Sequence, residues 1–344
     1  MMDLEFVELM PFASLLVDEA MAIRPDENAV IVTDTRIGKY PGTGQLVQAI
    51  AAALAERGID FNIITFKARN IRGQSMPAYT EEIIRSADAA VILLSQSFLY
   101  TEAWQRIILG DKKARIITLP LGEDVNGTDD IYYKLPKTKE EMYRIVEIGE
   151  MLEEKLMKGH HTVRVTAPNG TDLTFRSGER RIYLGKGIVR RPNEISVIPA
   201  GGISVGVNGG SANGTIVFDQ RFNLFKTRYL ESPIVCTVEN GHVTKLSGGI
   251  EAERFEEYVK SLPYPKEQVL NIAEFGVGFN NISSFDGVDA GEWEQVYGAS
   301  HIGIGADAGF GGQVAIPFHE DGMIAKSTVT IDGEDVCRDG EFIL

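Results

Sequence analysis

His319 and Asp321, near the carboxyl end of the sequence, are two positions apart and are the residues best suited to chemistry. On an extended strand both side chains would point to one face, so an imidazole and a carboxylate could bind the same cation. Glu320 would point to the other face, and the run 323–331 that follows has the composition of a strand. A single His-x-Asp pair also occurs by chance on polar loops, so this interpretation needs further residues.

Two other side chains supply that support. Glu274 is isolated within the apolar stretch 271–277, and burying a carboxylate there is costly unless it is paired or bound to a metal. His301 lies in a second stretch that is rich in glycine. We therefore expect a cation site that contains Glu274, His301, His319 and Asp321. The alternative for Glu274 is a structural, hydrogen-bonded carboxylate.

Glu194 is another unusual acid, because it enters the apolar run 195–198 directly after Arg190 and Arg191. An ion pair with one of these arginines would explain it without any function. The two cysteines are too few for a disulfide framework or a Cys-rich zinc module. The turn after the first expected strand lacks G-x-G-x-x-G, and no G-x-x-x-x-G-K-[ST] occurs, so nucleotide binding is not expected.

The formal charge is −15, and residues 267–344 hold 14 acidic side chains against only 2 basic ones. This balance argues against nucleic acid and anionic membranes as partners, because both require patches of Lys and Arg. No apolar run reaches 18 residues, and residues 1–21 have no basic segment before an apolar core. We therefore expect no membrane span, no signal peptide and a cytoplasmic protein.

The elements that must position these side chains follow from hydrophobic periodicity. Apolar runs that predict buried strands alternate with amphipathic runs that predict helices, which is typical of a parallel sheet covered on both faces. The expected strands are 29–33, 61–66, 89–94 and 114–119, and the expected helices are 44–57, 80–86 and 137–158. Residues 1–158 should therefore form a doubly wound α/β domain.

After Gly159 the sequence changes to short alternating segments separated by Gly, Asn and Pro turns, which predict antiparallel strands and hairpins. The run 195–198 is among these segments, and one helix is expected at 251–262. Gly303 and Gly305 are interpreted as tight-turn residues. Residues 159–344 should thus form a β-rich α+β domain that carries the metal site.

Several stretches in this second half resemble the M29 metallo-aminopeptidases (aminopeptidase T and relatives) and also the iron-dependent 2,5-dihydroxypyridine 5,6-dioxygenases. They follow the family order and are residues 163–175, 192–199, 211–219, 248–259, 272–280, 300–312, 318–321 and 329–342. The resemblance implies a metal site in the second domain and assembly as a homo-oligomer. In the aminopeptidases the metal ligands fall on Glu194, Glu274, His301, His319 and Asp321.

The resemblance to the aminopeptidases implies two divalent ions, Zn²⁺, Co²⁺ or Mn²⁺, that activate water. Glu274 or Glu194 would then act as general base. Two positions depart from that family, because Ala308 replaces a tyrosine and Val296 replaces a glutamate. The dioxygenases instead have a two-His, one-carboxylate iron(II) triad. Its first His aligns with Glu274.

An iron triad could still be rebuilt here from His301, His319 and Asp321. The sequence therefore predicts first a metal-dependent hydrolase of an amide-like bond in a peptide or small molecule. The alternative is a ring-cleaving iron(II) dioxygenase of the dihydroxypyridine type. A third possibility is a metal-binding protein that keeps the fold without catalysis.

Overall fold

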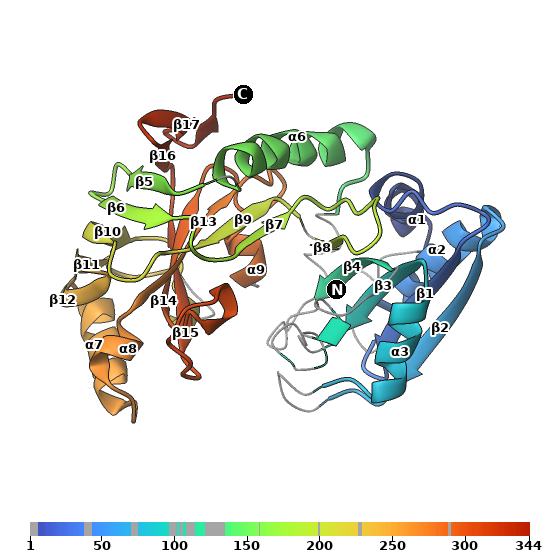
Figure 1. Cartoon of the computed structure of the whole chain (residues 1–344), viewed down its shortest axis with the longest axis horizontal. Helices are drawn as coiled ribbons and strands as arrows, with labels where there is room; N and C mark the ends of the chain where they lie inside the picture. The colour runs from blue at the N-terminus through green and yellow to red at the C-terminus, as the bar shows by residue number, and fades with distance from the viewer. Residues whose placement is uncertain are drawn as a thin grey trace. The chain divides into compact units, whose positions relative to one another are not determined.

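Two units make up the chain, and the backbone passes between them more than once. In this computed structural model the first unit contains Met1–Val146 and Gly185–Ala200, and the second contains Glu147–Leu184 and Gly201–Leu344. The residues that the structure describes are 6–37, 43–69, 75–95, 101, 103, 106–107, 114–120, 135–157, 159–198, 200–225, 229–287 and 290–344. Each unit has its own sheets (Figure 1).

A five-stranded parallel sheet forms the first unit, in the order β2-β1-β3-β4-β8. Its strands are β1 (Asn28–Asp34), β2 (Asp60–Phe66), β3 (Ala89–Leu94), β4 (Arg115–Pro120) and β8 (Ile195–Val197). The expected parallel α/β sheet is confirmed. Strand β8 differs from expectation, because it was placed among the antiparallel strands and instead pairs in parallel with β4.

Helices cover both faces of this sheet. In β1, Ile31 packs into a core that includes side chains of α1 (Phe6–Leu15) and α2 (Thr43–Glu56), whereas Val30 and Val32 pack into a second core with α3 (Ala78–Ser86). Burial on both faces explains the unbroken apolar runs 29–32 in β1 and 89–94 in β3. Helix α1, which contains one acidic residue, Glu8, and a proline, Pro11, was not expected from the sequence.

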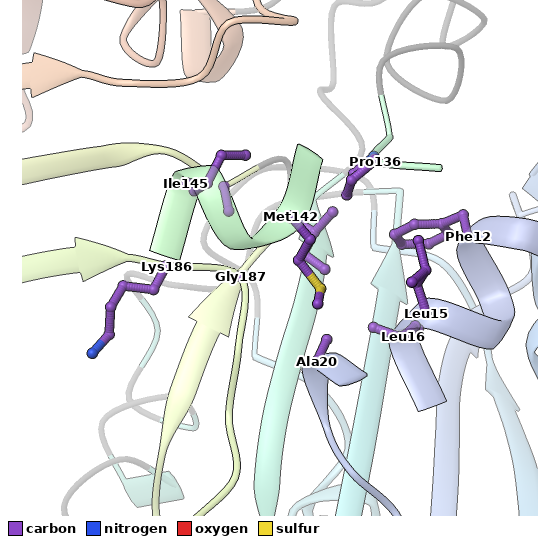
Figure 2. A pocket seen from close by; sticks show the side chains of 11 residues that line it. Phe12, Leu15, Leu16, Ala20, Pro136, Met142, Ile145, Lys186 and Gly187 are labelled. Atoms are coloured by element: carbon purple, nitrogen blue, oxygen red, sulfur yellow. The ribbon is translucent and has the colours of Figure 1, made fainter. Parts of the chain in front are cut away.

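A small apolar cavity lies in the first unit, between α1, the π-helical turn Leu16–Ala20 and the start of α6 (Lys139–Leu156). Figure 2 shows Phe12, Leu15 and Met142 around it, and the Lys186 side chain extends away from it. Its volume of about 10 Å³ is about the room that one water molecule needs. It is therefore a packing gap rather than a ligand pocket.

Two antiparallel sheets form the second unit. The larger has the order β12-β11-β10-β6-β5-β16-β17-β18, and its strands are β5 (His161–Thr166), β6 (Asp172–Ser177), β10 (Asn213–Phe218), β11 (Ile234–Glu239), β12 (His242–Gly248), β16 (Thr328–Ile331), β17 (Glu334–Arg338) and β18 (Glu341–Phe342). The smaller has the order β15-β14-β13-β9-β7, and its strands are β7 (Ile182–Gly185), β9 (Gly202–Gly206), β13 (Ile272–Gly278), β14 (Ser300–Gly305) and β15 (His319–Ile324).

The helices α6 and α7 (Ile250–Ser261) lie where the sequence predicted them, and the short helices α8 (Lys266–Val269) and α9 (Ala290–Trp293) were not expected. The interpretation of Gly303 and Gly305 as turn residues is wrong, because both belong to β14. Within the described part of the chain, no helix is both long and apolar enough to cross a membrane.

Candidate metal centre

The five-stranded sheet of the second unit brings four candidate residues onto one face. Gly303 of β14 pairs with Glu274 of β13 on one side and with Asp321 of β15 on the other. Opposed residues share a face of a sheet, so these three positions form one row across three strands. His301 and His319 lie on the same face, because each is two positions along its strand from a member of the row.

The side chains of this cluster converge. Nε2 of His319 lies 3.2 Å from Oε2 of Glu274 and 3.4 Å from Oδ1 of Asp321. Nε2 of His301 lies 3.2 Å from Oε1 of Glu274. One ligand atom from each of Glu274, His319 and Asp321 lies within 4.8 Å of the others. Glu274, His301 and Asp321 are buried, and His319 is partly buried.

Two glycines of the same face make room for the cluster. A Cβ on Gly303 would lie 2.7 Å from Nε2 of His319 and 2.9 Å from Oδ1 of Asp321. A Cβ on Gly276 would lie 2.0 Å from Cε1 of His301. The imidazole of His301 therefore lies directly over Gly276, and the His319–Asp321 pair lies over Gly303. This close approach explains why glycine stands inside these strands.

Hydrogen bonds to neighbouring groups orient two of the four side chains. Nδ1 of His319 is 2.6 Å from the carbonyl oxygen of Ala306, and a carbonyl only accepts, so Nδ1 carries the proton and Nε2 faces the cluster. Asn223 donates from Nδ2 to Oδ2 of Asp321 at 3.1 Å. Oδ1 of Asp321 is buried and has no hydrogen-bond partner among the described residues. Second contacts of this kind are typical of metal ligands.

The electrostatics of the cluster are those of paired opposite charges. Burial alone would raise the pKa of Glu274, but hydrogen bonds with His301 and His319 hold it well below its usual range. Burial alone would lower the pKa of His301, but its hydrogen bond with Glu274 and the charge of Glu294 raise the pKa to about 9. Burial alone would lower the pKa of His319, but the negative charge of Asp321 holds the pKa well above its usual value.

The cluster fits a divalent cation. Without a metal, two imidazolium charges balance the two carboxylates, and a divalent ion would supply the same charge in place of those protons. Oδ1 of Asp321 is buried and makes no hydrogen bond with the described residues, and the oriented Nε2 of His319 faces both carboxylates, so these atoms are available as ligand atoms. One imidazole and two carboxylates suit a hard or borderline ion such as Mn²⁺, Fe²⁺ or Zn²⁺.

A buried polar network fixes the loop that follows β14. Asp307 pairs with Arg180 at 2.6 Å and accepts hydrogen bonds from the Asn271 side chain at 3.2 Å and from the Val314 backbone at 2.7 Å. Asp307 directly follows Ala306, whose carbonyl orients His319. Asp307 thus stabilises the backbone that orients a candidate ligand, a role that its sequence context did not reveal.

The other residues singled out from the sequence lie in different settings. Glu194 belongs to the first unit, where it accepts hydrogen bonds from the backbone N–H groups of Arg190 at 2.7 Å and Arg191 at 2.9 Å. These local bonds account for Glu194, and its role as a ligand or base stays a prediction. Ala308 opens a short 3₁₀ turn, and Val296 forms an isolated bridge with Asn280.

The stretch 202–206 (GISVG) matches the G-x-S-x-G pattern of nucleophilic serines. Ser204 lies in the middle of β9, however, and not at the strand-to-helix turn that exposes such a nucleophile. No hydrogen bond joins Ser204 to a histidine in the described part of the chain. The motif therefore does not indicate covalent catalysis.

A family model described as NicX, 2,5-dihydroxypyridine 5,6-dioxygenase, matches residues 17–344 of the chain. Among curated proteins, the 2,5-dihydroxypyridine 5,6-dioxygenase of Pseudomonas putida strain KT2440 is 23% identical over 199 residues. This match covers 55% of the chain and 56% of that relative. The chain thus spans little more than half the length of this curated relative.

Two solved structures share the fold. The 2,5-dihydroxypyridine dioxygenase from P. putida KT2440 matches with a TM-score of 0.77 and 18% identity, over 99% of this chain and 98% of that one. Wild-type AmpT from Thermus thermophilus, an M29 aminopeptidase, matches with a TM-score of 0.61 and 14% identity, over 98% and 99%. Both resemblances seen in the sequence therefore have a counterpart in the fold.

Proposed function

Because the chain belongs to the 2,5-dihydroxypyridine 5,6-dioxygenase family, we propose that it is a metal-dependent dioxygenase that cleaves the ring of a hydroxylated pyridine. One observation carries this proposal: within the cluster, Glu274, His319 and Asp321 are buried or partly buried and their ligand atoms lie within 4.8 Å of one another. The substrate class is 2,5-dihydroxypyridine or a closely similar ring, and both atoms of O₂ would enter the product as the C5–C6 bond breaks.

The residues of the cluster would have two different roles, metal binding and positioning of a ligand. Glu274, His319 and Asp321 would hold the metal, and iron(II) in that position would supply the one-electron chemistry that O₂ requires. His301 would keep the Glu274 carboxylate in place through its bond at 3.2 Å. The His319 side chain is 27% exposed, so the cluster is accessible from solvent at this residue.

An amide hydrolase, which the sequence favoured first, is the second candidate. The observation in its favour is the donor set, because two carboxylates and one imidazole differ from the two imidazoles and one carboxylate of a typical iron(II) triad. The match of the family model over residues 17–344 favours the dioxygenase nevertheless. The fold shared with AmpT is compatible with either reaction.

A single preparation tests both candidates. Metal-free protein is loaded anaerobically with Fe²⁺, and O₂ uptake and loss of 2,5-dihydroxypyridine are followed together. Equal molar consumption of O₂ and substrate is expected. No consumption with iron, together with amine release from an aminoacyl anilide after loading with Zn²⁺ or Co²⁺, would replace the dioxygenase by the hydrolase.

Variants then connect the activity to the cluster. His319→Ala and Asp321→Asn should each lose bound metal and O₂ uptake. Glu320→Gln is the matched control, because Glu320 lies between them in β15 and points to the opposite face of the strand. If all three variants kept the metal content of the wild type, the cluster would not be the metal site.

A further inference from the structure

Asn223 lies beside the candidate ligand Asp321 at the edge of the five-stranded sheet. It opens the short 3₁₀ turn Asn223–Phe225, just after a segment that runs along β15. In that segment Phe222 forms an antiparallel bridge with Gly322, and the Met323 backbone N–H donates to the carbonyl of Arg221 at 2.9 Å. This pairing places Asn223 opposite Asp321, on the face that carries the cluster.

The orientation of the Asn223 amide follows from its partner. A carboxylate only accepts hydrogen bonds, so the atom at 3.1 Å from Oδ2 of Asp321 must be the amide nitrogen. The amide oxygen Oδ1 therefore faces away from that carboxylate oxygen. It is buried and has no hydrogen-bond partner in the part of the chain that the structure describes.

The Asn223 amide is not needed to hold the backbone of this segment in place. Arg221 already anchors the segment, because its guanidinium lies 4.0 Å from the ring centre of Tyr229 and 4.9 Å from that of Trp293. Its Nε also donates to the carbonyl of Phe285 at 2.8 Å. Asn223 is half-buried, but its amide oxygen is buried and unused while its amide nitrogen holds a candidate ligand. A buried acceptor of this kind calls for a further partner.

We propose that Asn223 serves the metal centre in two ways. Its nitrogen is a positioning group, which holds Oδ2 of Asp321 so that the unpartnered Oδ1 remains available to the metal. Its oxygen is a binding group, which accepts a hydrogen bond from a hydroxyl of the ring that occupies the site. The second role rests on the proposed function, because that function assigns the ring, whereas the first role needs only the metal.

The first role is tested by metal affinity without any substrate. Asn223→Leu keeps the shape of the side chain and removes both polar groups. Asn169→Leu is the matched control, because Asn169 is likewise a half-buried asparagine of the second unit whose amide is hydrogen-bonded, to the Val217 carbonyl at 2.8 Å and from the Thr171 backbone at 3.0 Å. Affinity for Fe²⁺ or Co²⁺ is measured by competition with a chelator, and the melting temperature of each metal-free protein is recorded.

Asn223→Leu should bind the metal about 10- to 100-fold more weakly than the wild type, as expected when a group that orients a ligand is lost. Asn169→Leu should keep wild-type affinity even where its melting temperature falls. If Asn223→Leu kept wild-type affinity, or if both variants lost it equally, the positioning role would be wrong. Asn223→Ala replaces Asn223→Leu in the same comparison if the larger side chain prevents folding.

The second role is tested at saturating metal and without O₂. The dissociation constants of 2,5-dihydroxypyridine and of its two mono-methyl ethers are measured for the wild type and for Asn223→Leu. These measurements form a double-mutant-type cycle. The Asn223→Leu substitution removes the amide, and methylation of the ring removes one hydroxyl hydrogen. The preference for the diol over one of the ethers should fall at least about fivefold in the variant, the loss expected for one hydrogen bond.

Equal preferences in the wild type and in the variant, for both ethers, would overturn the binding role. A wild-type protein that holds the metal but binds none of the three rings would overturn the assigned substrate class, and the binding role with it. The comparison of metal affinities would still decide the positioning role. Failure of the proposed function and failure of the positioning role are therefore distinguishable.

Discussion

Replacing Gly303 by alanine should remove the metal site while leaving the fold intact. The new Cβ would lie 2.7 Å from Nε2 of His319 and 2.9 Å from Oδ1 of Asp321, whereas ordinary contact begins at 3.4 Å. Both atoms must therefore retreat by about half an ångström or more. Metal–ligand distances tolerate only about 0.2 Å, so two of the three ligands would be displaced together.

The expected loss is at least about 100-fold in metal affinity, which is about 2.7 kcal/mol. Stability should change little, because the displaced atoms are side-chain ends and glycine inside a strand is about 0.5–1 kcal/mol less stable than alanine. The φ angle of Gly303 lies outside the left-handed region, so its backbone accepts an alanine. Gly309→Ala is the matched control, since its Cβ would meet no atom within 4 Å.

Isothermal titration of metal-free protein with Co²⁺ measures the affinity, and circular dichroism gives the melting temperatures. We expect Gly309→Ala to match the wild type and Gly303→Ala to lose measurable binding, with both melting temperatures within about 3 °C of the wild type. A Gly303→Ala variant that binds Co²⁺ within threefold of the wild type would refute the reasoning, because the metal could not then lie over Gly303.

Three further outcomes are expected. Metal affinity should rise between pH 6 and pH 9, by up to tenfold per pH unit for each proton displaced, because the metal replaces imidazolium protons of the cluster: the pKa of the ligand His319 is held well above its usual value, and that of His301 is raised to about 9; a pH-independent titration would contradict this. A metal held at 100 times its dissociation constant should add about 2.7 kcal/mol of stability, and a chelator should abolish the gain in melting temperature. In the first unit, Glu27→Gln should cost about 3–5 kcal/mol in urea unfolding, because it leaves the buried Arg115 without its partner at 2.7 Å, whereas the exposed Glu56→Gln should cost almost nothing. Burial opposes ionisation of Glu27, but Arg115 lowers its pKa, so that stabilisation is present above about pH 4.5 and is lost as the pH falls.

Local patterns carried much of the fold. The strands β1 to β4 follow from short continuous apolar runs, and the helices α2, α3, α6 and α7 follow from amphipathic runs of period 3.6. Both patterns depend only on neighbouring residues. The common direction of His319 and Asp321 follows in the same way from the period of a strand. Strand β8 was misplaced, because whether a strand is parallel or antiparallel depends on a partner that its own composition does not name.

The rest of the site depends on register, which is why the sequence did not reveal it. Glycine is common in turns, so the sequence around Gly303 predicted a turn. Its role in leaving room for the ligands becomes clear only from the pairing with Glu274 on one side and Asp321 on the other. Asn223 approaches Asp321 across 98 positions of sequence. A period of two predicts which ligands share a strand face, but long-range pairing decides what lies beneath and beside them. The residues that orient a metal centre are therefore harder to predict from sequence than its ligands. Substitution of Gly303 and of Asn223 tests whether these two residues, which are not ligands, control metal affinity.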